Sequence, residues 1–164
     1  MTPFMVLNVQ STLSLVGFAL IARWHIAPRL AARSREDALV PLLWIHVFRY
    51  APLTLFAPGQ VDPRVPADVA AIVGYGDLAS GLVALLAVVA LRVRARAGIG
   101  LAWAFSVVGI ADLVFATAKA VGAELYTYYL GWNWYIVAFY VPVLAVSHAM
   151  IVYILLDRAR SGSR

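Results

Sequence analysis

Few residues of this chain could do chemistry in an apolar setting, and most of them are ionisable groups within strongly hydrophobic runs. The stretch WIHVFRYAP, residues 44–52, holds His46 and Arg49 three positions apart. Asp77, Asp112 and His148 lie in later apolar runs. An Arg or Asp in such a run costs about 2.5–3.5 kcal/mol in lipid, and intramembrane charges are typical of proton relays and of substrate or ion pathways. The candidate ligand-binding or proton-handling residues are therefore His46, Arg49, Tyr50, Asp77, Asp112, Asn133 and His148.

The charges among these candidates do not balance. A buried arginine needs a carboxylate partner, and the side chain of Arg49 could reach either Asp77 or Asp112. The remaining aspartate carries a surplus negative charge unless it binds a proton or a cation. His46 and Arg49 share one helix face, which we expect to point inward, with Tyr50 close by. The same charges could instead form a purely structural clamp that fixes helix packing.

Composition indicates the elements that must position these residues. The chain has 164 residues, 63% of them hydrophobic, and a mean hydropathy of +0.86, whereas soluble domains have about 45–50% apolar residues. A spanning helix needs about 20 mainly apolar residues. We therefore predict a single all-α domain over residues 1–164, an integral membrane bundle of five transmembrane helices. The expected helices cover residues 4–21, 39–57, 67–91, 99–121 and 128–156.

Three of these helices carry further signals. The first has no basic segment before it and no small-residue cleavage site after it, so we expect a retained helix and not a signal peptide. Its outer half is polar, from Asn8 to Ser14, and is expected to face the bundle because polar groups in lipid would lack partners. Pro142 is expected to kink the fifth helix. The tyrosines and tryptophans of residues 126–135 fit an interfacial belt, with a ligand cage as the alternative.

Basic residues predict the orientation. Ten of the thirteen Lys and Arg residues stand in three clusters, which are Arg23, Arg29, Arg33 and Arg35, then Arg92, Arg94 and Arg96, then Arg158, Arg160 and Arg164. Five spans place all three clusters on one side. By the positive-inside rule, the amino terminus lies outside and the carboxyl terminus in the cytoplasm, as in a multi-pass protein of the cytoplasmic (inner) membrane. The clusters flank apolar runs, so the lipid bilayer and no nucleic acid is the expected partner.

The expected function is the binding or transport of a small molecule, lipid or proton. A membrane enzyme acting on a lipid or isoprenoid substrate stays open, with a histidine or aspartate as general acid or base. So does a structural helper subunit of a larger membrane complex, or a homo-oligomer. Cysteine is absent, and no P-loop or HExxH pattern is present, so we expect no metal site. We also expect no cofactor, the minor alternative being haem held by His46 and His148.

Overall fold

The computed structural model describes the backbone of residues 1–161 and the side chains of residues 1–157. Over this part the chain is helical and contains no strand. Five helices are long and apolar enough to cross a membrane: Pro3–Ala31, Arg35–Phe56, Ala67–Arg92, Gly98–Gly122 and Asn133–Asp157. The five predicted helices are confirmed. The first runs ten residues further than expected, the second begins four residues earlier, and the fifth begins five residues later.

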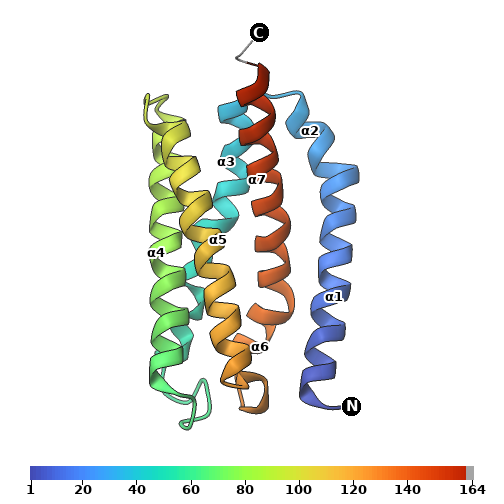
Figure 1. Ribbon diagram of the computed structural model, residues 1–164, viewed down its shortest axis with the longest axis vertical. Helices are drawn as coiled ribbons and strands as arrows, with labels where there is room; N and C mark the ends of the chain where they lie inside the picture. The colour runs from blue at the N-terminus through green and yellow to red at the C-terminus, as the bar shows by residue number, and fades with distance from the viewer. Residues whose placement is uncertain (162–164) are drawn as a thin grey trace.

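These long helices are divided by irregular turns. In chain order the elements are α1 (Pro3–Ile21), η1 (Ala22–Ile26), α2 (Ala27–Ala31), α3 (Arg35–Val47), η2 (Phe48–Phe56), α4 (Ala67–Arg92), α5 (Gly98–Gly122), η3 (Leu125–Thr127), α6 (Asn133–Tyr135), η4 (Ile136–Tyr140) and α7 (Val141–Ser161). Of the turns, η1 and η4 are π-helical and η2 and η3 are 3-10 helical. Successive long helices run antiparallel (Figure 1).

The bundle has two chemically different ends. The end that holds the chain's amino terminus and the loops of residues 57–66 and 123–132 is here named the aromatic end. The opposite end holds the end of α7 and the loops of residues 32–34 and 93–97, and is here named the basic end. Of the basic residues assigned to the cytoplasmic side, Arg164 and the side chains of Arg158 and Arg160 lie outside the described part.

Prolines account for the irregular turns. A proline has no N–H for the helix ladder, and its ring crowds the carbonyl four residues earlier. Pro28 and Pro142 each follow a π turn, η1 and η4, by two residues. The break expected at Pro142 is thus present as a π turn directly before it, because the wider turn relieves this crowding. Pro52 lies inside η2, where the tighter 3-10 winding replaces the α-helix.

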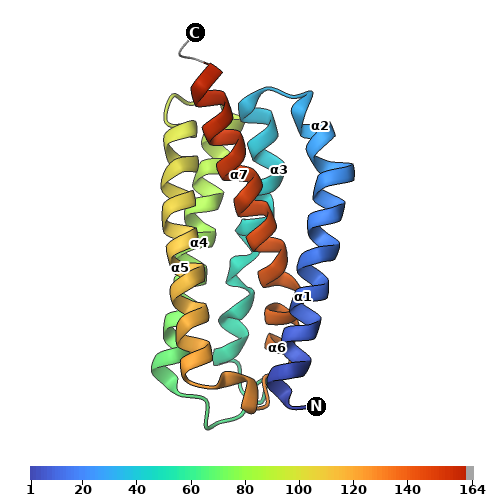
Figure 2. The ribbon, with the colours of Figure 1, turned by 45° about the vertical axis from the view of Figure 1, so that its right-hand side comes forward.

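The four-helix body consists of α3 with η2, α4, α5 and α7, and its densest core lies toward the basic end. Leu39, Leu43, Phe105, Ile151 and Leu155 are fully buried there. By contrast, α1 lies along one side of the body, against α7 and η4, and none of its residues is buried (Figures 1 and 2). The body therefore positions the site, and α1 is attached to its flank.

The polar half of α1 faces the bundle only in part. Gln10 accepts a hydrogen bond from the indole of Trp134 at 2.8 Å, and the Ser11 hydroxyl donates to the Val137 carbonyl at 3.4 Å. Asn8 is exposed and donates instead to the Phe4 carbonyl of its own helix. The expectation is confirmed for Gln10 and Ser11 and is wrong for Asn8, whose amide is satisfied within the helix.

A glycine sets the closest approach of α4 to the second helix. A Cβ on Gly81 would lie 3.2 Å from the Val47 carbonyl oxygen and 3.4 Å from that of His46. Both neighbours are backbone atoms at the junction of α3 and η2, which cannot move without shifting the helix.

We therefore expect Gly81→Val to lower the free energy of unfolding by about 1–3 kcal/mol through overpacking. Gly17→Val is the matched control, because a Cβ on Gly17 meets nothing within 4 Å. Denaturant unfolding in detergent, followed by circular dichroism, measures both. Equal effects of the two substitutions would show that the close approach at Gly81 is absent in solution.

Candidate functional site

The 3-10 winding of η2 carries Arg49 into the bundle. Side chains three residues apart in such a helix point the same way, and the buried residues of η2 are Arg49, Pro52 and Leu55. Just before this turn, the Tyr140 hydroxyl donates to the Ile45 carbonyl at 2.5 Å. That bond satisfies a carbonyl at the end of α3 and joins the second helix to η4.

Arg49 is fully buried and contacts three other helices. Its Nε donates to Asp77 Oδ1 of α4 at 2.6 Å, and its Nη2 donates to Asp112 Oδ2 of α5 at 2.5 Å. Its Nη1 donates to the Gly109 carbonyl of α5 at 3.0 Å and lies 3.4 Å from His148 Nε2 of α7. Arg49 thus pairs with both aspartates, where the sequence left the choice open. We name Arg49, Asp77 and Asp112 the clamp.

The clamp carries more negative than positive charge when its acids are ionised. Ser80 donates a further hydrogen bond to Asp112 Oδ2 at 3.2 Å. The other oxygen of Asp112 lies against Gly76, where a Cβ would collide with it. Within the described part of the chain, neither Asp77 Oδ2 nor Asp112 Oδ1 accepts a hydrogen bond. One guanidinium therefore serves two carboxylates, and each acid keeps one oxygen free.

The two histidines form a stacked cluster beside the clamp. The His46 and His148 ring centroids are 4.1 Å apart, and the Phe105 ring stacks on His148 at 5.0 Å. A guanidinium only donates, so His148 Nε2 is the acceptor and Nδ1 carries the proton. His46 Nε2 lies 2.9 Å from the Ser147 hydroxyl. Both Nδ1 atoms are buried and have no partner among the described residues.

The haem alternative does not fit this cluster. A porphyrin and its iron would have to lie between the two imidazoles, but rings 4.1 Å apart are in van der Waals contact. Each Nε2 also faces a protein partner, Ser147 for His46 and Arg49 for His148. No group of three or more His, Cys, Asp or Glu side chains that could hold a metal ion occurs in the described part.

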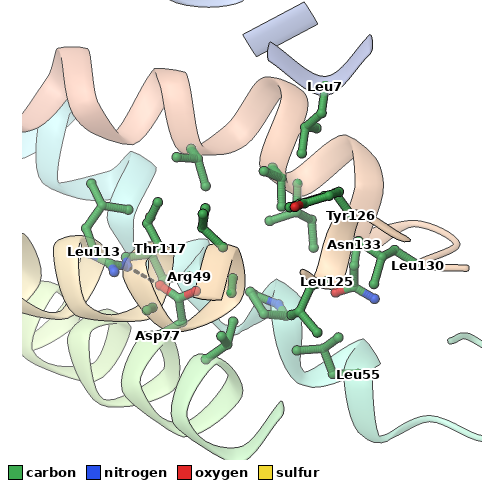
Figure 3. Close-up of a pocket in the computed structure, with 18 residues that line it drawn as sticks. Leu7, Arg49, Leu55, Asp77, Leu113, Thr117, Leu125, Tyr126, Leu130 and Asn133 are labelled. Carbon is green, nitrogen blue, oxygen red and sulfur yellow. Dashed lines mark hydrogen bonds and ion pairs between the residues drawn. The ribbon is translucent and has the colours of Figure 1, made fainter. Parts of the chain in front are cut away.

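An apolar cavity of about 130 Å³ lies between the clamp and the aromatic end. Arg49 and Asp77 form one end of it, and Tyr126, Leu130 and Asn133 form the other (Figure 3). Most of the lining is aliphatic and comes from α1, η2, α4, α5 and the segment from η3 to α7. The cavity therefore gives access to one carboxylate of the clamp and not to Asp112, which does not line it.

The structure gathers most of the predicted residues, with one exception. His46, Arg49, Asp77, Asp112 and His148 meet at the clamp and the histidine cluster. Asn133 lines the far end of the cavity, where its Oδ1 accepts from Thr54 at 3.1 Å.

Tyr50 is 49% exposed, lies outside the cavity and packs on Phe48. The expectation that it lies beside the inward face is wrong, because the tight winding of η2 turns it outward while Arg49 turns inward.

Sequence reasoning also missed residues that complete the site. The Gly109 carbonyl, Ser80, Ser147 and Tyr140 all bond to the clamp or to its immediate support. The spacing of Asp77 and Ser80 on one helix was the only usable signal. A carbonyl acceptor and hydroxyls inside apolar runs give no pattern in the sequence.

Comparison with known proteins shows a family for this chain. The family described as "Domain of unknown function (DUF8737)" matches residues 6–156, which include every predicted site residue. No curated protein and no solved structure matches the chain.

The ionic clamp can be tested by removing its charges selectively. Arg49→Met leaves two carboxylates without a counter-ion, and breaking a buried pair costs about 3–5 kcal/mol. Replacing Asp77 and Asp112 by Asn as well removes the uncompensated charge, so the triple variant should recover much of the lost stability. Unfolding by sodium dodecyl sulfate, followed by circular dichroism, measures both.

Arg64→Met is the control, because Arg64 pairs with Asp62 at 2.7 Å and its side chain is 82% exposed. Exposed ion pairs contribute about 0–1 kcal/mol. A triple variant no more stable than Arg49→Met would contradict the ionic account of the clamp.

Proposed function

We propose that this chain, which belongs to the family described as "Domain of unknown function (DUF8737)", binds a small, mainly apolar molecule in a membrane and exchanges a proton at its paired aspartates. The observation that carries this proposal is that Asp77 belongs both to the clamp and to the wall of the cavity. Its carboxylate bonds to Arg49 at 2.6 Å and also lines the apolar cavity. A molecule in the cavity would therefore meet the surplus charge of the clamp.

The placement that we propose is a multi-pass protein of the cytoplasmic membrane, with the basic end in the cytoplasm. The five apolar helices support insertion. The loops and helix ends at the basic end carry Arg33, Arg35, Arg92, Arg94 and Arg96, whereas Arg64 and Lys119 are the basic residues near the aromatic end. This bias supports an outside amino terminus. The clamp then lies near the middle of the hydrocarbon layer.

The size of the cavity limits its occupant. Drug-sized ligands occupy pockets of about 300–1,000 Å³, whereas an apolar protein cavity of about 150 Å³ binds benzene. A space of about 130 Å³ therefore suits a single ring or one end of a longer, lipid-like molecule. Thr117 and Val121 of α5 line the cavity and are also exposed. An opening on that side would admit a molecule directly from the hydrocarbon layer.

Polar groups at the two ends of the cavity define the chemistry of this occupant. At the clamp, Asp77 Oδ2 accepts no hydrogen bond from the described residues, so it can accept one from a ligand or contact a cationic group. At the aromatic end, Asn133 is 5% exposed, and its Nδ2 is buried without a partner in the described part of the chain. A buried unpaired donor costs about 1–3 kcal/mol. The best-matched ligand has an acceptor at one end and a donor or cationic group at the other.

The proposed proton exchange follows from the charges of the clamp. With the cavity empty, one proton on the Asp77–Asp112 pair leaves a single carboxylate against the single guanidinium. A cationic group arriving at Asp77 neutralises the surplus instead, so that the aspartate pair releases its proton. Binding would in this way be coupled to proton exchange, as at other intramembrane acids. A clamp that is only structural predicts no such exchange.

Proton exchange can be tested by infrared titration of the purified protein in lipid. The carboxylic-acid band of the wild type changes with pH in several steps, because the chain has eight Asp and Glu residues. We expect Asp77→Asn to remove the step that belongs to the clamp. Asp68→Asn is the control, because Asp68 stands in the first turn of α4, away from the clamp. If neither Asp77→Asn nor Asp112→Asn changed the titration, proton exchange would be contradicted and the clamp would be only structural.

Occupation of the cavity can be tested by native mass spectrometry. We expect the gently solubilised protein to retain a small apolar molecule, and Ala116→Phe to lose it, because Ala116 lines the cavity and a phenyl ring fills much of about 130 Å³. Ala104→Phe is the control, since Ala104 is exposed on the same helix outside the cavity. A wild-type protein that carries no molecule, even with benzene or an alkylamine added, would overturn the ligand proposal.

A further inference from the structure

A second and larger hollow lies at the basic end, on the other side of α7 from the clamp. This cleft measures about 670 Å³ and runs between α1–α2 and α7. We propose that it holds one phospholipid of the surrounding bilayer, and specifically a zwitterionic lipid with a primary ammonium, of the phosphatidylethanolamine class. The proposal rests on the membrane placement given above and is independent of the cavity ligand.

The walls of the cleft are unusually small side chains. Six alanines line it: Ala19, Ala22, Ala27, Ala31, Ala38 and Ala149. Small residues at facing positions usually let helices pack closely in a membrane. Here they border an open space beside the π turn η1 and α2 (Figure 1). A space of this size, bounded by methyl groups, suits an acyl chain.

Depth places the mouth of the cleft at the level of lipid headgroups. Arg23 follows Pro3, the start of α1, by twenty residues, or about 30 Å at 1.5 Å per residue. The hydrocarbon core is also about 30 Å thick. Asp157 lies in the last part of α7, four residues before the helix ends at Ser161 at the basic end. Both charged residues line the cleft, so its mouth is polar, whereas Val146 and Ala149 line it deeper in the bundle.

The charges at the mouth match both halves of a zwitterionic headgroup. The exposed guanidinium of Arg23 presents a planar set of N–H donors that suits a phosphate. The carboxylate of Asp157 can accept a hydrogen bond from an ammonium group in addition to its contact within the chain, and it repels a second anion. A primary ammonium also donates hydrogen bonds to a carboxylate, which a quaternary ammonium cannot do. The phenol of Tyr153, which is 69% exposed, lines the same cleft and offers a further donor.

The test is native mass spectrometry of the full chain released from nanodiscs that contain equal parts of phosphatidylethanolamine, phosphatidylglycerol and phosphatidylcholine with identical acyl chains. We expect one phosphatidylethanolamine retained per chain. Arg23→Gln should reduce this retention about ten-fold, the effect of losing one charge-assisted hydrogen bond. Ala149→Phe should weaken retention by narrowing the deeper part of the cleft, and Asp157→Asn should shift the preference toward phosphatidylglycerol.

Two control variants keep the result interpretable. Arg29→Gln removes a neighbouring arginine that bonds to the His25 carbonyl and does not line the cleft, so lipid retention should be unchanged. Ala116→Phe fills the other cavity and should also leave lipid retention unchanged, which separates this site from the proposed ligand site. Circular dichroism confirms that each variant is folded.

Equal lipid retention by the wild type, Arg23→Gln and Ala149→Phe would overturn the site, because unspecific boundary lipid does not depend on these residues. Preferential retention of phosphatidylglycerol by the wild type would overturn the assignment of the headgroup. Loss of lipid from Arg29→Gln as strongly as from Arg23→Gln would also contradict it, since only net charge would then matter.

Discussion

A fully buried guanidinium is the constraint around which this bundle is organised. Arg49 carries a guanidinium, and in an apolar interior an unpaired charge is prohibitive. Asp77 and Asp112 must therefore approach it from α4 and α5, and the His148 ring from α7. Glycines make this approach feasible. Gly76 leaves room for the Asp112 carboxylate, and Gly109 lets both Arg49 and the His148 ring reach the backbone of α5.

The clamp also divides the body into two unlike halves. Toward the basic end, leucines, alanines and Phe105 fill the space between the helices. Toward the aromatic end, the same four-helix body leaves a cavity against Asp77. Three chain features coincide at this boundary: the end of α3, the 3-10 helix that Pro52 imposes, and the Tyr140 hydrogen bond to Ile45. The irregular backbone thus occurs where the polar groups are, and where the packing loosens.

The first helix stands apart from this arrangement. It buries no residue, contributes Leu7 to the cavity wall and forms one side of the cleft at the basic end. Hydrogen bonds at Gln10 and Ser11 and the contact of Phe18 with Phe139 join it to α6 and η4. It thereby borders both hollows without contributing to the clamp.

The sequence alone determined the number of helices and their approximate bounds, because hydrophobicity accumulates along the chain and needs no partner. It also identified the five ionisable side chains within the apolar runs, since such a residue is recognisable whichever way its helix is rotated. Tertiary structure decided what these side chains do. Helix rotation and contacts between distant segments decided three points. Both aspartates share Arg49, Tyr50 turns outward, and the two imidazoles are too close for haem. The cavity beside Asp77 and the alanine-lined cleft are volumes left between helices, so no single segment encodes them.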